Sequence, residues 1–165
     1  MVELGKFLSK VSSKNAHCIC ILLKNDLDTP LTNPRVYKKD GKMYSGPQNV
    51  IQPGEFACLG FHKTKFLPFG PKGIVAYDLK ELGITFCLYF NNPYFGHNKF
   101  TMSWMNEGRN VDQNLFRALA LDNNIWYAYG HMTWRDMKSD THNVMASGFI
   151  GEGWTATLQV EIKNT

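Results

Sequence analysis

Apolar and polar residues alternate in short runs along most of the chain. In WTATLQVEI (154–162), Ala, Leu, Val and Ile alternate with Thr, Gln and Glu, which is the two-residue period of a half-buried β-strand. Further short runs, bounded by Gly, Pro or Asn, lie at 17–23, 34–39, 55–61, 72–79, 84–90, 100–105, 125–131 and 143–150. About ten short strands with turn residues between them predict a mainly β protein, a β-sandwich.

The first residues have a helical period instead. Leu4, Phe7, Leu8 and Val11 fall at i, i+3, i+4 and i+7, so residues 2–12 are predicted to form an amphipathic helix. Such a helix either docks on the body of the protein or lies on, or enters, a membrane. At 1.5 Å per residue it extends about 17 Å, whereas a membrane-spanning helix needs about 20 residues.

A second helix is predicted within RNVDQNLFRALALD (109–122), near 111–121, because its apolar residues form one helical stripe. The stripe consists of Val111, Leu115, Ala118 and Leu119. The sequence has no internal repeat and no linker. We therefore expect one domain over 1–165, with an N-terminal helix at 1–14 and a sandwich over 15–165, so that two α-helices flank the sheets.

The composition is that of a globular protein, with 44% apolar and 19% charged residues in 165. The net charge of +4 is mild and no basic run exceeds Lys38-Lys39, so no nucleic-acid partner is expected. The sequence has no stretch of about 18 apolar residues that could span a membrane as a helix, and its first residues lack the apolar centre of a signal peptide. The soluble form is expected to be cytoplasmic, or secreted after processing.

Motifs of known catalytic chemistry are missing from the sequence. It contains no G-x-S-x-G, no Gly-rich phosphate loop and no H-E-x-x-H. The five histidines lack metal-ligand spacing, and His17 is expected to be a hydrogen-bonded structural residue. The cysteines lie in apolar runs and are expected to be buried free thiols: Cys18, Cys20, Cys58 and Cys87. The protein is therefore expected not to be an enzyme and to bind neither a cofactor nor a metal.

Aromatic residues are concentrated in two segments. FNNPYFGHNKF (90–100) combines Pro and Gly with four rings, so it is predicted to be a loop whose Tyr94 and Phe95 face outward. Tyr and Trp rings suit the membrane–water interface, where an apolar body and a polar tip are both satisfied. The predicted membrane-facing aromatics are Tyr94, Phe95, Phe100, Trp126 and Tyr127. The alternative for any single ring is that it faces the core.

Several stretches in order resemble the actinoporin family of pore-forming cytolysins. They are LGKFLSKVSSK (4–14), LTNPRVYKKDGKMYSGPQNVIQP (31–53), GPKGIVAYDL (70–79), LYFNNPYFGHNKF (88–100) and VDQNLFRAL (111–119). The resemblance implies a β-sandwich flanked by two helices that binds sphingomyelin or other phosphocholine lipids. It also implies that the N-terminal helix, with Leu4, Phe7, Leu8 and Val11, inserts into a target-cell membrane and that the protein forms a homo-oligomeric cation pore there.

The resemblance also assigns headgroup-binding residues. Pro93 matches the loop proline of the family, Asn91 stands where the family has a Ser, and Phe116 stands where it has a headgroup-contacting Tyr, so the ring is kept and the hydroxyl is lost. Phe100 matches a membrane-facing Trp, whereas Lys72 stands where the family has an apolar pocket residue.

A glycan-binding, lectin-like module is the alternative reading. Asn91, Asn92 and Asn98 lie in one loop, and an amide side chain both donates hydrogen bonds to sugar hydroxyls and accepts them. Sandwiches of this type also occur among fungal lectins, and sugar sites use the same aromatic residues. A glycan is therefore kept as a possible partner besides lipid.

Overall fold

The computed structural model describes residues 6, 17–128 and 133–165. The predicted helix at 2–12, with Leu4, Phe7, Leu8 and Val11, lies outside the described residues apart from Lys6. Within the described ranges, no helix is long and apolar enough to cross a bilayer.

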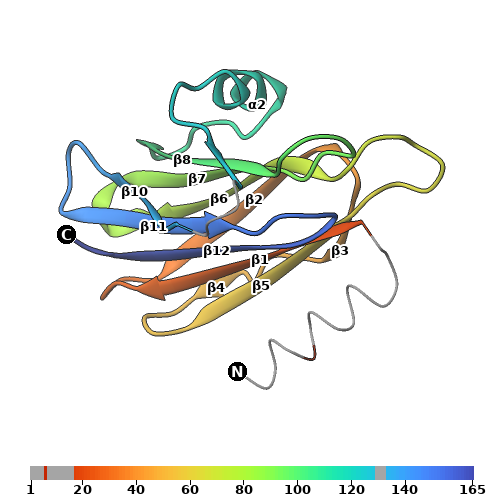
Figure 1. Ribbon diagram of the computed structural model, residues 1–165. Coiled ribbons are helices and arrows are strands. Elements are labelled where there is room, and N and C mark those ends of the chain that lie inside the picture. The colour runs from red at the N-terminus through yellow and green to blue at the C-terminus, as the bar shows by residue number, and fades with distance from the viewer. Residues whose placement is uncertain (1–5, 7–16, 129–132) are drawn as a thin grey trace.

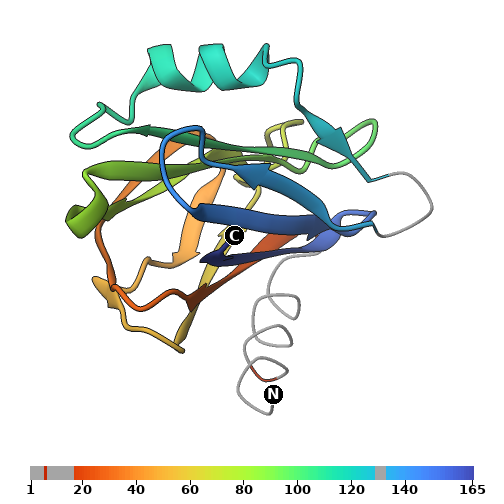
Figure 2. The ribbon, with the colours of Figure 1, turned by 90° about the vertical axis from the view of Figure 1, so that its left-hand side faces the viewer.

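Two six-stranded sheets pack face to face, which confirms the predicted β-sandwich (Figures 1 and 2). The first sheet has the order β10 (Arg135–Lys138), β11 (Val144–Ile150), β12 (Thr155–Asn164), β1 (Cys18–Asp26), β5 (Phe56–His62) and β3 (Lys42–Ser45). The second has the order β4 (Val50–Ile51), β2 (Leu31–Asp40), β6 (Lys72–Leu79), β7 (Ile84–Asn91), β8 (Lys99–Asn106) and β9 (Trp126–Tyr127). A short 3-10 helix, η1 (Lys80–Leu82), joins β6 to β7.

The core lies between the two sheets and follows the predicted alternation. On β12 the apolar residues of the 154–162 run face inward, and the Thr, Gln and Glu residues between them do not. Phe61 of β5 meets Phe90 of β7 across the layer, with ring centroids 4.7 Å apart. Burial of these inward faces is the main source of stability for a sandwich of this size.

The single α-helix of the described chain beyond residue 17, α2 (Gln113–Ala120), covers the outer face of the second sheet (Figure 1). Asp112 caps its first turn, because the carboxylate accepts a hydrogen bond from the backbone amide of Leu115 at 3.0 Å. Leu115, Phe116 and Leu119 are buried in a second apolar cluster with residues of β6 and β7. The helix predicted near 111–121 is confirmed, with its start two residues later.

Strand directions bring several turns to the same end of the sandwich. β1 and β12 run parallel, so Cys18 pairs with Thr155, and antiparallel β5 ends beside them at His62. In the other sheet, β6 and β8 begin at the same end as β7 finishes, since Lys72 pairs with Asn91 and Asn91 with Lys99. Loops 63–71, 92–98 and 151–154 therefore start or finish at this end.

A buried carboxylate stabilises the outer face of the second sheet. Asp78 accepts hydrogen bonds from the Arg35 guanidinium, from Thr85 Oγ1 at 2.6 Å and from Asn33 Nδ2 at 2.7 Å. The Arg35 guanidinium also donates to the carbonyl of Arg109 at 2.8 Å, which fastens the chain ahead of α2. Removing one partner of such a pair leaves the other charge uncompensated.

Replacing Asp78 with Ala should therefore lower the free energy of unfolding by about 3–5 kcal/mol, since the half-buried Arg35 charge loses its partner. Urea unfolding followed by tryptophan fluorescence measures the change. The exposed Asp140, replaced in the same way, is the control and should change stability by less than about 0.5 kcal/mol. Equal midpoints for the two variants would contradict this role of Asp78.

All four cysteines are free, as predicted. Cys18, Cys20 and Cys87 are buried, whereas Cys58 is only half-buried. Burial raises the pKa of the Cys87 thiol to about 12. Burial, with smaller contributions from Cys58 and Cys18, raises the pKa of the Cys20 thiol to about 12. Both thiols therefore stay protonated at neutral and mildly alkaline pH.

Because the thiolate is the reactive form, Cys20 and Cys87 should resist iodoacetamide at pH 8 in the folded protein, and Cys58 should react first. Peptide mass spectrometry after timed labelling identifies the order. In urea all four should react at similar rates. Labelling of Cys20 or Cys87 as fast as Cys58 in the native protein would show that these thiols are accessible after all.

Candidate functional site

Loop 92–98 is fastened to the body by one buried amide. Asn92 Nδ2 donates to the carbonyl of Cys18 at 3.0 Å and to that of Trp154 at 2.9 Å. His17 Nε2 lies 3.0 Å from both Asn92 Oδ1 and the Asn92 carbonyl, which are acceptors, so this ring nitrogen is the donor. The predicted structural role of His17 is confirmed. The side-chain oxygen and nitrogen of Asn92 both have partners within the protein.

Loop 63–71 is fastened to the same point. The backbone amide of Asn92 donates to the carbonyl of Pro71 at 3.0 Å. Gly70 approaches so closely that an added Cβ would lie 1.8 Å from the Asn92 carbonyl oxygen and 2.5 Å from His17 Nε2. Only glycine permits this approach.

Loop 151–154 is held by a second buried amide. Asn98 Nδ2 donates to the carbonyls of Gly151 and Gly153, each at 2.8 Å. Together with the bond from Asn92 to the Trp154 carbonyl, this fixes the turn that carries Trp154 against loop 92–98.

Rings from two of these loops stack on His17. The His17 and Trp154 rings are nearly parallel with centroids 5.2 Å apart, and Tyr94 lies 4.8 Å from Trp154. Trp154 Nε1 donates to the Tyr94 carbonyl at 3.0 Å, so its polar atom is satisfied inside the stack. Phe95 lies 5.0 Å from Tyr94 and is 82% exposed. Phe95 thus stands on a fixed base and points into solvent.

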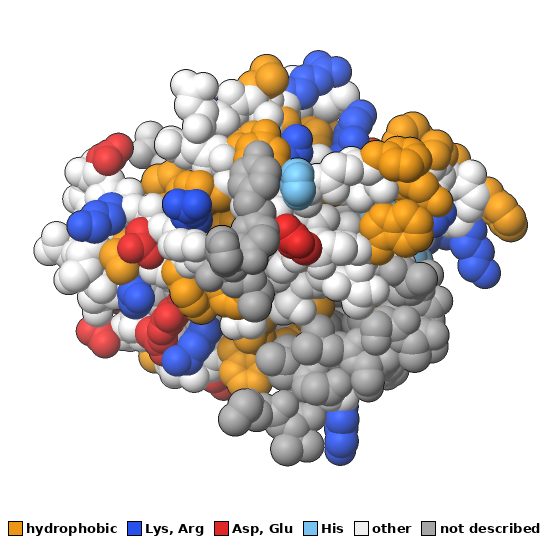
Figure 3. All heavy atoms as spheres, viewed as in Figure 1, with side chains coloured by type: hydrophobic (Ala, Val, Ile, Leu, Met, Phe, Trp, Pro, Cys, Tyr) orange, Lys and Arg blue, Asp and Glu red, His pale blue; other side chains and the backbone are white. Residues whose placement is uncertain are grey.

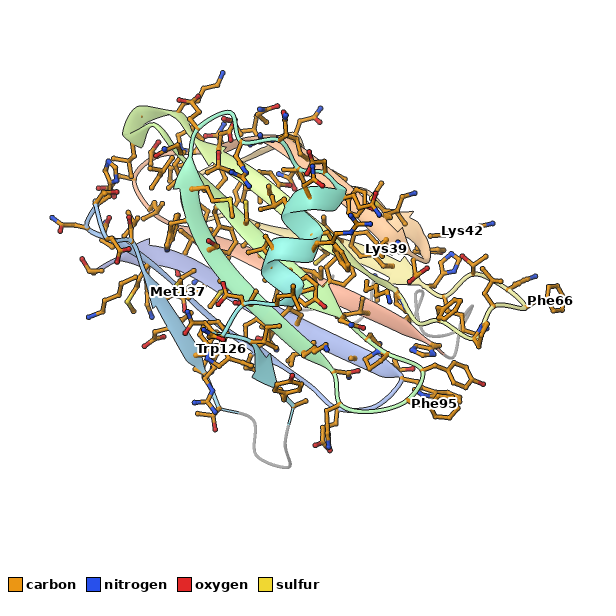
Figure 4. The ribbon with its side chains drawn as sticks, turned by 90° about the horizontal axis from the view of Figure 1, so that it is seen from above. Lys39, Lys42, Phe66, Phe95, Trp126 and Met137 are labelled. Carbon is orange, nitrogen blue, oxygen red and sulfur yellow. The ribbon has the colours of Figure 1, made fainter. Side chains whose placement is uncertain are left out.

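We call this region the aromatic end: loops 63–71, 92–98 and 151–154. Besides Phe95 it exposes Phe66, Leu67, Phe69 and Trp154. Apolar side chains gather at this end of the molecule in the space-filling view (Figure 3). Seen from above, Phe66 and Phe95 both project from it (Figure 4).

Lysines lie among these rings. The Lys63 ammonium sits 5.8 Å from the centre of the Tyr94 ring, and the Lys72 ammonium sits 6.0 Å from that of Phe69. Both distances lie within the range of cation–π contact. Lys72 also pairs with Asp40 at 3.1 Å.

The predicted membrane-facing aromatics divide into three groups. Tyr94 and Phe95 belong to the aromatic end, and Tyr127 is exposed on edge strand β9, with the Lys99 ammonium 5.7 Å from its ring. Trp126 packs against the core. The outward placement of Phe100 is wrong: it is 1% exposed, because β8 begins at Lys99 and turns this ring inward against Trp126.

Two of the three predicted headgroup residues, Asn91 and Phe116, contact Tyr89. Asn91 Nδ2 donates to the Tyr89 hydroxyl at 3.3 Å, while Asn91 Oδ1 is buried without a partner. Phe116 packs on Tyr89 from α2 at 5.3 Å and is only 7% exposed, which leaves little of its ring for a ligand. Pro93 is half-buried at the start of loop 92–98.

Two cavities lie away from these residues. One of about 480 Å³ is lined by residues of β8 and β10, including Trp104 and Met137. Another of about 450 Å³ is lined by Thr29, Leu82 and His142. Neither includes Asn91, Pro93 or Phe116.

Solved structures share this fold. The crystal structure of the lipid-binding protein Nakanori matches with a TM-score of 0.78 and 14% identity, over 98% of this chain and 79% of that one. This chain has the same β-sandwich fold. The crystal structure of IP-1A from Alcaligenes faecalis matches with a TM-score of 0.51 and 9% identity, over 94% of this chain and 97% of that one. No protein-family model matches the sequence, and no curated protein matches it either. The resemblance to actinoporins is thus supported at the level of the fold.

The three asparagines considered for a glycan site are not presented together. Asn92 and Asn98 are buried, and both side-chain amides donate to backbone carbonyls of the described chain. Asn91 Oδ1 is buried without a partner. The expectation that all three face sugar hydroxyls is therefore wrong, because the loop uses two of them to hold itself in place.

Sequence reasoning missed Phe66, Phe69 and Trp154. KFLPFGP (65–71) carries the same signal as loop 90–100, since it places rings next to Pro and Gly. Trp154 follows Gly-Glu-Gly, a turn sequence, so its position at a loop could also have been predicted.

Replacing Gly70 with Ala should separate loop 63–71 from Asn92, since the new methyl group would overlap the Asn92 carbonyl. We expect a loss of about 1–3 kcal/mol in unfolding free energy, as for other overpacked sites, and faster proteolysis within the loop. Urea unfolding and limited trypsin digestion at Lys63 and Lys65 measure both effects. Gly46 is the matched control, because its nearest neighbour would be 3.7 Å from an added Cβ. Similar behaviour of the two variants would refute the close-approach argument.

Proposed function

We propose that this protein binds the surface of lipid membranes through its aromatic end. The observation that carries this proposal is Phe95, 82% exposed on a base of stacked rings that hydrogen bonds hold in place. Single exposed apolar residues are common on soluble proteins, but a group of them on three adjoining loops marks an interaction site. The shared fold with a protein described as lipid-binding supports the choice of lipid.

The composition of the aromatic end fits a membrane interface. Tyr and Trp rings favour the headgroup region, and Phe side chains favour the acyl boundary beneath it. Full burial of one Phe contributes about 1.5–3 kcal/mol, so a single ring gives weak binding. Several rings presented together, with their loops already ordered, lose little conformational entropy on binding.

A headgroup site is proposed at Asn91 and Lys72, beside Pro93. Asn91 Oδ1 is unpaired and can accept a hydrogen bond, and Lys72, the neighbour of Asn91 across β6 and β7, supplies a positive charge. The Lys72 ammonium suits the phosphate of a lipid headgroup, whereas Asn91 Oδ1, an acceptor, suits a hydroxyl or ammonium donor of the headgroup. A choline cage requires open aromatic faces, and Phe116 exposes only 7% of its surface, so its ring does not supply such a face.

Pore formation is the further step that the actinoporin resemblance implies. It would use the N-terminal segment with Leu4, Phe7, Leu8 and Val11 and would require the protein to oligomerise on the membrane. A helix over 2–12 reaches about 17 Å against a hydrocarbon thickness of about 30 Å. Binding and leakage must therefore be measured separately. The proposal describes a binding protein that acts at a target membrane, not an enzyme.

The test is cosedimentation with vesicles, with and without sphingomyelin. Replacing Phe95 with Ala should weaken vesicle binding about 5–30-fold, because roughly 1–2 kcal/mol of apolar transfer is lost while the loop keeps its hydrogen bonds. Release of an entrapped dye, recorded on the same samples, reports pore formation.

Phe56 replaced with Ala is the matched control. It is also an exposed Phe, but it begins β5 at the opposite end of the sandwich. This variant should bind as the unmodified protein does. If the unmodified protein sediments with neither vesicle, or if both variants weaken binding equally, the aromatic end is not a lipid site. Binding without dye release would retain lipid binding and remove the pore.

A further inference from the structure

Loop 63–71 forms a finger at the aromatic end. Phe66 at its apex is 99% exposed, and Leu67 and Phe69 beside it are exposed as well. The backbone of Phe66 has a φ of +64°, a left-handed conformation that is uncommon for an aromatic residue. A bulky ring held outward in this way gains nothing from the protein core, so its position requires another explanation.

The finger is closed by its own lysine and anchored at its base. Lys63 Nζ donates to the carbonyl of Leu67 at 3.0 Å and lies 3.4 Å from that of Thr64. At the base, Gly70 packs on the Asn92 carbonyl and Pro71 accepts from the Asn92 amide. Phe66 and Phe95 are therefore carried on loops that share one anchor, and both project from the same end (Figure 4).

The charges of the molecule are divided between its two ends. At the end of the sandwich that carries the finger lie Lys39, Lys42, Lys63, Lys65, Lys72 and Lys99, against the acidic residues Asp40 and Glu152. Asp40 is paired with Lys72. The turns and strand ends at the opposite end carry Asp26, Asp28, Glu55, Glu81, Glu107 and Asp140, against Lys80, Arg109, Lys138 and Lys163. The mild net charge of +4 therefore hides a positive finger end.

We propose that the finger is a second membrane-inserting element, and that it selects bilayers rich in anionic phospholipid. Phe66, Leu67 and Phe69 enter the boundary between headgroups and acyl chains. The lysines around them remain at headgroup level, where they pair with lipid phosphates and carboxylates. This inference rests on the proposed function, because it names the lipid class that the aromatic end prefers.

An anionic bilayer is the occupant that the charges favour. A neutral bilayer would gain from the exposed rings but not from six lysines against two acidic residues. Each Lys near an anionic surface strengthens binding about fivefold at low salt, and the effect decays within about 10 Å at 0.1 M salt. Apolar insertion and charge should therefore be separable by salt.

The experiment compares vesicles of phosphatidylcholine with vesicles that contain about 30% phosphatidylserine, at about 0.05 M and 0.5 M salt. The unmodified protein should bind the anionic vesicles at least about tenfold more tightly, and salt should reduce the difference. Phe66→Ser should weaken binding about tenfold to both vesicles, because it removes an inserted ring and no charge. Lys65→Glu should weaken binding at least about tenfold to the anionic vesicles at low salt only.

Two control variants match these changes at the opposite end of the sandwich. Phe56→Ser removes another exposed Phe, and Lys80→Glu reverses another exposed Lys. Both should bind as the unmodified protein does. Because Phe66 and Lys65 are exposed, circular dichroism should be unchanged in both finger variants.

The outcomes distinguish a failure of the finger's role from a failure of lipid binding itself. If no vesicle binds the unmodified protein, lipid binding itself fails. If vesicles bind and Phe95→Ala weakens binding, but Phe66→Ser and Lys65→Glu do not, lipid binding stands and the finger is overturned. Equal binding to neutral and anionic vesicles at low salt would overturn the selection for anionic lipid.

Discussion

The buried amide of Asn92 holds the aromatic end together. It joins β7 to the start of β1 and of β12, since it donates to the carbonyls of Cys18 and Trp154 and accepts from His17. A buried amide left without partners costs about 1–3 kcal/mol, so these bonds are obligatory once the side chain is inside the sandwich. The two sheets meet at this end through hydrogen bonds as well as through apolar packing.

This anchor explains how exposed rings can be kept in place without a core beneath them. His17 lies over Asn92 and serves as a platform for Trp154, which in turn supports Tyr94. Each ring therefore rests on a residue whose position is already fixed. Phe95 and Phe66 extend from this support, so their exposure is a property of the fold and not of a loose loop. Such ordering lowers the entropy that a surface contact would otherwise cost.

Much of the fold could be predicted from the sequence, because its signals are local. Alternation in 154–162 gives β12 and its buried face, and the stripe through Leu115 and Leu119 gives α2. The site was less predictable, because exposure at a loop depends on where the flanking strand begins. β8 begins at Lys99, so Phe100, one residue later, turns inward, whereas Phe95 remains outside. A shift of one residue changes the face of the ring.

The roles of the asparagines were beyond the reach of sequence for a different reason. Asn91, Asn92 and Asn98 have the same chemistry, but the partners of Asn92 and Asn98 are carbonyls more than 50 positions away in the chain. Such pairings follow only from the way the sheets close. The same closure leaves Asn91 Oδ1 buried without a partner, on the residue that pairs with Lys72 across β6 and β7.

The separation of charge between the two ends determines which surface the exposed apolar rings contact. Exposed Phe side chains alone would also favour association between copies of the protein, since apolar patches do not choose their partner. Lysines around the same rings oppose that association, because two positive ends repel each other. An anionic surface attracts the same lysines. The charges that keep two aromatic ends apart therefore favour contact with a negatively charged bilayer.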